Sequence, residues 1–164
     1  MRHAMIRAAS ARLALAVAVE LGVDQARLLS KAGISAAEVA NDEQRVSLHA
    51  VGRLLEGAAQ LSGCAHFGLL AGSRARIEFL GYLGAIGRHA ATVRTAIDVF
   101  ARMAVLHSEG SGIMAVGSAE RPAFAYVVHE TRIPGYDHLV AASLAIIANV
   151  LKALCGPQFK LDAV

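Results

Sequence analysis

The side chains best suited to chemistry in this sequence are seven histidines and two cysteines. Zinc and related metals are held by His and Cys ligands at close spacing, such as His-x3-His or Cys-x2-Cys. The nearest approach to such a pair is Cys64-x-His66, and no second pair stands at a useful spacing from it. The other histidines are dispersed along the chain, as His3, His49, His89, His107, His129 and His138. The spacing therefore predicts no metal site.

Sequence motifs for catalysis are missing as well. A hydrolase nucleophile of the Gly-x-Ser-x-Gly type needs a strand-to-helix turn, whereas Glu109 to Gly112 (EGSG) reads as a loop. The glycines at 81, 84 and 87 follow no expected strand and lack the G-x-G-x-x-G order of a dinucleotide site. We therefore expect no enzyme and no cofactor.

The chemistry that remains is recognition of a small molecule. A ligand pocket is mostly apolar and carries a few fixed polar groups. Five polar side chains lie on otherwise apolar elements that we expect to converge, and they are the candidate ligand-binding residues: Tyr82, Arg102, His107, Tyr126 and His129. The alternative is that Arg102 is solvated and that Tyr126 and His129 lie on the outer surface of a strand.

The composition indicates a helical framework for these candidates. A chain of 164 residues suits a single domain. Hydrophobic residues make up 55% of it but aromatic residues only 5%, so the apolar content is mostly Ala, Leu, Val and Ile. Alanine has the best helix propensity and lets helix backbones approach closely, so the composition favours closely packed helices.

Charge, cysteine content and hydropathy restrict the partners and the location. The net charge is +3, but the basic residues are scattered, whereas a nucleic-acid surface needs a concentrated basic face. Cys64 and Cys155 lie far apart and indicate reduced thiols rather than a disulfide framework. The longest apolar run, Leu139 to Val150, is shorter than the roughly 20 residues that span a bilayer. We expect a cytoplasmic protein with no membrane partner.

Capping residues and periodicity predict where the helices begin and end. Asp24 is placed as an N-cap and Gly33 as the end of the same helix. Val46 and Val51 form a hydrophobic staple around a helix that opens at Ser47 and ends at Gly63. The 3.6-residue period predicts helices over residues 10–21, 24–31, 47–63, 92–107 and 136–154, with a short apolar turn over 66–72 closed by Gly72. The last helix is apolar on most of its circumference, which predicts that it is buried.

The period changes in the second half of the chain. Residues 112–117 and 123–130 are short β-branched or aromatic runs, which predict two antiparallel strands joined by a turn near residues 119–122. Residues 158–164 alternate like the opening of another strand, so we expect a chain that continues further or that pairs with a second copy. The predicted fold class is α+β and predominantly helical, with N-terminal helical hairpins and a bundle packed on a small antiparallel sheet.

Residues 16–34 approximate a DNA-reading helix-turn-helix. A small residue and a turn glycine stand where two crossing helices need them, at Ala18 and Gly22. The second helix would present Gln25, Arg27, Ser30 and Lys31. Asp24 opposes this interpretation because its negative charge would meet phosphate, and any helical hairpin makes the same demand for small residues.

A family resemblance rests chiefly on residues 45–72, RVSLHAVGRLLEGAAQLSGCAHFGLLAG. This stretch resembles the N-terminal effector domain in one large branch of AraC-type bacterial transcription regulators, with its Arg-Val entry, Leu-Leu-Glu helix, Ser-Gly break and Phe-Gly-Leu. Residues 21–35, 79–103 and 151–157 are similar to the same branch. Two departures stand out, because Cys64-Ala65 replaces the usual Asp-Pro and residues 89–92 replace the usual Ser-Pro-Thr.

The resemblance implies that residues 1–164 form a single sensor and oligomerisation domain, truncated at its C-terminal edge and separated from a DNA-binding domain. The implied partners are an unknown small-molecule effector, a second copy of the chain in a homodimer, and DNA through the missing domain alone. The helical pattern differs from a β-rich jelly roll that binds sugars, so we do not expect a sugar. The alternative function is a stand-alone helical interaction module or a small helix-turn-helix DNA-binding protein that uses residues 16–34.

Overall fold

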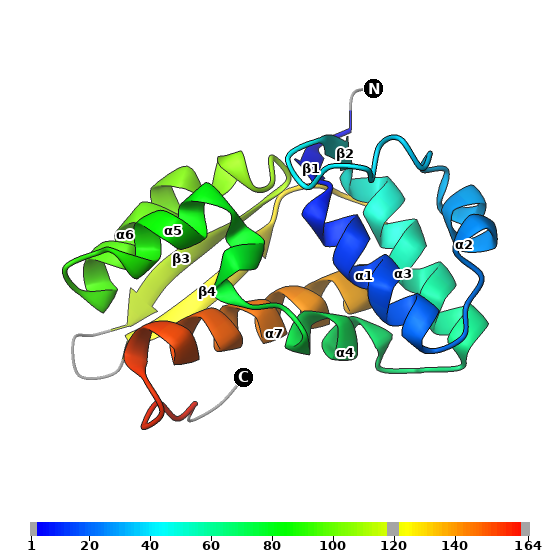
Figure 1. Cartoon of the computed structure of the whole chain (residues 1–164). Coiled ribbons are helices and arrows are strands. Elements are labelled where there is room, and N and C mark those ends of the chain that lie inside the picture. Colours follow the sequence, from blue (N-terminus) through cyan, green and yellow to red (C-terminus); the bar gives the residue numbers. More distant parts are fainter. Residues whose placement is uncertain (1–2, 118–121, 162–164) are drawn as a thin grey trace.

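Helices dominate the computed structural model, which describes residues 3–117 and 122–161 (Figure 1). Within these ranges seven α-helices and two short 3₁₀ helices accompany two separate two-stranded antiparallel sheets. The helices are α1 (Ala9–Glu20), α2 (Gln25–Ala32), α3 (Leu48–Ser62), α4 (Phe67–Ser73), η1 (Ile77–Leu80), α5 (Tyr82–Arg88), α6 (Val93–Met103), η2 (Ala104–Leu106) and α7 (Tyr136–Cys155). The strands are β1 (Met5–Arg7), β2 (Arg45–Ser47), β3 (Ser111–Gly117) and β4 (Pro122–Val128). The predicted α+β, mostly helical class is confirmed, but two sheets stand where one was expected.

Capping chemistry defines the first helices much as the sequence predicts. The Asp24 carboxylate accepts a hydrogen bond from the Arg27 backbone N–H at 2.7 Å and so caps α2. Gly33 and Gly63 end α2 and α3 in the left-handed conformation, with φ of 68° and 70°. The predicted boundaries of these helices are therefore confirmed. Ser47 does occupy the N-cap position of α3, but its side chain makes no capping hydrogen bond.

The first of two hydrophobic cores lies among α1, α2, α3 and α4. Its largest fully buried side chains include Phe67, Leu28, Leu48 and Leu54. Sheet β1–β2 closes one end of this core, with Ile6 opposite Val46 in the register. Neither strand was predicted, because three residues are too few to show an alternating pattern.

The second core lies among η1, α5, α6, the β3–β4 hairpin and α7. Its buried members include Leu83, Phe100 and Val150. The hairpin runs in register from Ser111 opposite Val128 to Gly117 opposite Pro122, which confirms the two predicted strands. The turn predicted near residues 119–122 lies, apart from Pro122, outside the described residues. Helix α6 ends at Met103 rather than at residue 107, because a 3₁₀ turn replaces its last predicted residues.

Helix α7 connects the two cores. It contributes Leu139 to the first and Val150 to the second, and Figure 1 shows it running beneath both groups of elements. It crosses α4 backbone to backbone at two glycines one turn apart. A Cβ atom on Gly68 would lie 2.1 Å from the His138 carbonyl oxygen, and one on Gly72 would lie 2.3 Å from that of Ala142. The prediction that Gly72 closes a turn is therefore wrong. Gly72 lies inside α4, at a close helix crossing.

The surface of α7 is less covered than the sequence predicts. By length and hydropathy α7 is apolar enough to cross a membrane, a test that core helices of globular proteins also pass. Here it packs on α4 and on both cores, yet only Leu139, Ala142, Val150 and Leu151 are buried, and its middle is half-buried. The prediction that this helix is buried therefore holds for only part of its surface. Beyond Gly156 the predicted strand does not form over residues 158–161, and residues 162–164 lie outside the described part of the chain.

Candidate functional site

A cavity of about 130 Å³ lies between the two cores, against α7. A cavity of about 150 Å³ lined by Leu, Ile and Phe is large enough to hold benzene, so this one suits a molecule of similar size. The larger apolar residues of its wall come from both halves of the fold and from α7: Ile6, Leu13, Val51, Leu55, Phe79, Leu80, Leu83, Ile97, Phe100, Ile113, Phe124, Leu139, Ile146, Ile147, Val150 and Leu151. Residues of the two cores and of α7, the helix that both cores share, together enclose the cavity.

A few polar side chains interrupt this apolar wall, namely Ser10, His107, Ser108, Ser111, Tyr126 and Ser143. Three of them are close in the chain, where η2 passes into β3. The Ser111 hydroxyl donates a hydrogen bond to the Ser108 hydroxyl oxygen at 2.8 Å, and both residues are buried. The cavity therefore has one polar end made by His107, Ser108 and Ser111.

His107 is the distinctive group at this polar end. Its Nδ1 atom is buried and has no hydrogen-bond partner among the described residues, although part of the residue reaches solvent. Burial, followed by repulsion from the guanidinium groups of Arg7 and Arg45, lowers the pKa of His107 from its ordinary 6.5 to about 4. The imidazole is therefore neutral at pH 7 and offers one N–H donor and one lone pair. An unpartnered buried nitrogen of this kind suits a ligand that completes its hydrogen bond.

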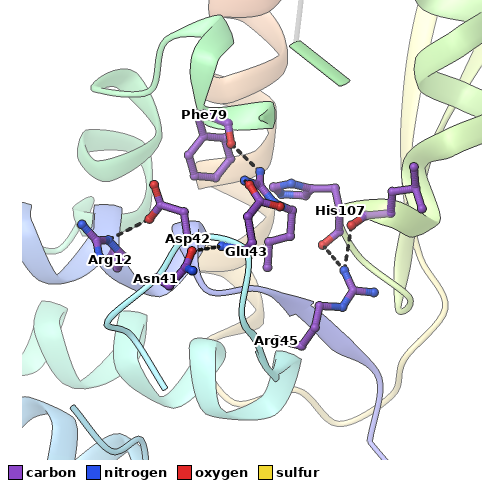
Figure 2. A network of polar contacts seen from close by, with 9 residues as sticks. Arg12, Asn41, Asp42, Glu43, Arg45, Phe79 and His107 are labelled. Atoms are coloured by element: carbon purple, nitrogen blue, oxygen red, sulfur yellow. Dashed lines mark hydrogen bonds and ion pairs between the residues drawn. The ribbon is translucent and has the colours of Figure 1, made fainter. Parts of the chain in front are cut away.

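Arginine side chains hold the backbone around His107 in place (Figure 2). Arg7 is almost fully buried, pairs with Glu43 and donates to the Phe79 carbonyl oxygen at 2.8 Å. Arg45 donates to the Leu106 carbonyl oxygen at 2.7 Å, just before His107. The loop before β2, residues 40–44, supplies Glu43 to these contacts, which tie β1 and β2 to η1 and η2.

The loop itself is fastened to α1. Arg12 forms an ion pair with Asp42 at 2.7 Å and donates to the Ala40 carbonyl oxygen at 2.9 Å. The Glu43 backbone N–H donates to the Asn41 side-chain oxygen at 2.9 Å, which shapes the turn (Figure 2). These contacts place the Glu43 carboxylate beside the Arg7 guanidinium group. The charges near the cavity are therefore paired with one another, whereas the Nδ1 atom of His107 has no partner among the described residues.

The structure brings two of the five candidate residues to the cavity. His107 and Tyr126 line it, whereas Tyr82, Arg102 and His129 do not. Tyr82 is 78% exposed at the first residue of α5, and Arg102 and His129 are also exposed. The serines that complete the polar end were missed because isolated serines carry no signal in a single sequence.

A separate polar cluster lies at the start of α3. His3, His49 and Glu130 each place one possible metal-ligating atom within 4.8 Å of the others. Histidines this far apart in the chain form no spacing motif, so the expectation of no metal site could not take their convergence into account.

Comparison with known proteins relates this architecture to transcription control. Residues 22–164 match the family described as the arabinose-binding domain of AraC transcription regulators, N-terminal. The chain is also similar to the HTH-type transcriptional regulator VirS of Mycobacterium tuberculosis, in strains CDC 1551 / Oshkosh and ATCC 25618 / H37Rv. Each is 29% identical over 145 residues, which cover 85% of this chain and 42% of the relative. The chain thus spans less than half the length of these curated relatives, and the matching family is non-enzymatic. The chain belongs to the family of N-terminal, arabinose-binding-type domains of AraC transcription regulators.

Proposed function

We propose that this domain binds a small-molecule effector in the cavity between its two cores and passes occupancy to a DNA-binding domain of the same regulator. The observation that carries the proposal is the buried, unpartnered Nδ1 of His107 at the polar end of an apolar cavity. Most of the effector's surface would contact Leu, Ile and Phe side chains, and one polar group would bond His107 or the Ser108–Ser111 pair. The cytoplasm is the expected location of such a regulator.

The lining argues for a small, mostly apolar effector and against a sugar. A pentose presents several hydroxyl groups, and each one buried without a partner costs about 1–3 kcal/mol. Most of the residues that line this cavity are apolar, and two of its hydroxyl groups, those of Ser108 and Ser111, already bond each other. A branched aliphatic or single-ring molecule with one hydroxyl or carboxyl group fits both the volume and the polarity.

The same arrangement suggests how occupancy is transmitted. A ligand in the cavity contacts both cores and α7, so it favours whichever packing of α7 best encloses it. A shift in the equilibrium between two packings would then bias the position of whatever follows Gly156 along the chain.

A thermal-shift screen tests the binding step. A cavity-sized compound with one polar group, at about 100 times its Kd, should raise the midpoint by about 5 °C or more. We expect His107→Phe, which removes the unpartnered nitrogen, to reduce this rise strongly. Arg102→Ala is the matched control, because Arg102 is exposed and lies outside the cavity.

Two results would contradict the proposal. One is an equal response in His107→Phe and the unaltered chain, and the other is a response to arabinose but to no apolar compound. Salt-sensitive DNA binding by this chain, lost in Arg27→Ala/Lys31→Ala, would favour the alternative function of residues 16–34. The structure gives that alternative less support, since Asp24 caps α2 and the Lys31 ammonium donates to the Gln60 side-chain oxygen at 2.8 Å.

We further propose that the domain forms a homodimer through the β3–β4 hairpin. The apolar face of α6, the other candidate surface, packs inward with Ala96, Ile97 and Phe100 buried. Met114 and Val116 on β3, by contrast, are 53% and 42% exposed on a two-stranded sheet whose outer edges have no neighbouring strand within the described residues. Exposed apolar strands of this kind favour pairing with another chain.

Sedimentation equilibrium tests the dimer surface. The unaltered chain should sediment as a dimer, and Val116→Lys should shift it to the monomer by placing a charge in the interface. Val19→Lys is the control, because Val19 is similarly exposed but lies on α1. A dimer that persists in Val116→Lys, or that is lost equally in both variants, would exclude this surface.

A further inference from the structure

We propose that His3, His49 and Glu130 form a binding site for a divalent transition-metal ion, zinc in the first place. The three residues come from distant parts of the chain: the segment before β1, the second residue of α3 and the segment just after β4. One ligating atom of each lies within 4.8 Å of the others. The two imidazole rings are 4.1 Å apart between centroids, and His3 Nδ1 lies 4.0 Å from a Glu130 carboxylate oxygen. The donors of a compact metal site are thus already gathered.

The second observation is a buried imidazole nitrogen of His49 that lacks a partner. His49 is only 9% exposed, and its Nδ1 atom is buried with no hydrogen-bond partner among the described residues. Buried nitrogen atoms normally find a partner, and one that lacks it calls for an explanation. A cation bound to this nitrogen supplies one, since metal ions are ligated by neutral imidazole.

The surrounding backbone holds the third ligand in place. The second oxygen of Glu130 accepts a hydrogen bond from the Ala4 backbone N–H at 3.0 Å. Ala4 is itself fixed, because its carbonyl oxygen accepts a hydrogen bond from the Leu48 N–H at 2.9 Å. Hydrogen bonds of this kind orient ligating carboxylates at metal sites. The remaining oxygen of Glu130 is the one that faces His3.

The donor set selects the class of metal. Two imidazoles and one carboxylate are the protein ligands of many zinc sites that keep a fourth position open, whereas magnesium and calcium prefer oxygen ligands alone. Zinc holds nitrogen at about 2.0–2.1 Å, so the three groups would need to draw closer together. The side chain of His3 is half exposed and free to make that adjustment.

A bound ion would join the first core to the hairpin that forms one side of the second. His49 belongs to the start of α3, and Glu130 lies two residues beyond the end of β4. Gly110, just before β3, packs against Glu130 and against Leu48, the neighbour of His49, since a Cβ atom there would lie within 3.2 Å of the Leu48, Ala4 and Glu130 side chains. The site is separate from the effector cavity, so its occupancy adds a second input to the relative position of the two cores.

Calorimetric titration of the tag-free, reduced chain with zinc chloride tests the proposal. We expect one zinc ion per chain and no heat of binding with magnesium. His3→Ala, a change at an exposed side chain that should leave folding intact, should weaken binding by at least about tenfold, and Glu130→Gln should act similarly. His89→Ala is the matched control, since His89 is an exposed histidine outside the cluster.

Cobalt(II) as a spectroscopic probe separates this site from the two free cysteines. Binding at the proposed site should give cobalt absorption without a thiolate charge-transfer band. Any of three results would overturn the proposal: no stoichiometric zinc binding, unchanged affinity in His3→Ala, or a thiolate band that assigns the ion to Cys64 or Cys155.

Discussion

Replacing Gly68 by alanine is expected to lower the free energy of unfolding by about 3 kcal/mol, the upper part of the usual range for overpacking. The added methyl group would lie 2.1 Å from the His138 carbonyl oxygen and 2.6 Å from its Cα atom. Both are backbone atoms of α7, so no side-chain rotation relieves the contact. The gain of about 1 kcal/mol in helix propensity does not offset it. Urea unfolding followed by circular dichroism measures the difference.

The matched control for this change is Gly57→Ala, in the middle of α3. A Cβ atom there would meet only the ends of the Leu28 and Lys31 side chains, at 3.2 and 3.3 Å. Those ends can move, so we expect anything from no change to a gain of about 1 kcal/mol. If Gly57→Ala and Gly68→Ala proved equally stable, the close crossing of α4 and α7 would be refuted.

Acidification from pH 7 to pH 4 is expected to reduce the stability of the domain by up to about 3 kcal/mol through His107 alone. The pKa of this imidazole is about 4 in the folded chain and about 6.5 in the unfolded chain. Above pH 6.5 neither state binds the proton, so His107 leaves stability unchanged. Between pH 6.5 and 4 only the unfolded state binds it, so stability falls as the pH falls. Below pH 4 both states are protonated, and the loss no longer grows.

His107→Phe isolates this contribution. The variant cannot take up the proton, so its unfolding free energy should vary less between pH 6.5 and 5 than that of the unaltered chain. Carboxylates with lowered pKa values, Glu38 and Glu78, add losses only near and below pH 4.5 and act equally in both proteins. At pH 7 the variant should be at least as stable, since it removes a buried nitrogen without a partner. Parallel pH profiles for the two chains would show that the pKa of His107 is not lowered in the folded chain.

Local signals allowed much of the helical framework to be predicted. Asp24, Gly33 and Gly63 act within one turn of their own position, so a single sequence reveals them. Thr92 likewise caps α6 by accepting a hydrogen bond from the Thr95 N–H at 3.1 Å. The sheet β1–β2 was missed because its pairing joins two three-residue segments across the whole of α1 and α2. Its strands depend on long-range contacts that local patterns do not encode.

The candidate site was predicted in part for a related reason. The elements that surround the cavity were expected to converge, but the direction of each side chain depends on its phase. Tyr126 and His129 are three residues apart, so a strand continued through both would point them to opposite faces. Arg102 is two positions from Phe100, which turns it about 200° away from that buried residue on α6. The position of each residue within the strand or helix period therefore separates Tyr126, which lines the cavity, from His129, and Phe100, which also lines it, from Arg102.

Because both cores include residues of α7, the two halves of the molecule are coupled in unfolding. Leu139 and Val150 belong to different cores but to one continuous helix. If α7 leaves one core, it also exposes apolar side chains of the other core to solvent. The two halves should therefore melt as one cooperative unit, despite having separate hydrophobic interiors. Amide hydrogens on α2, remote from the cavity, would then exchange more slowly when a molecule rests against the middle of α7.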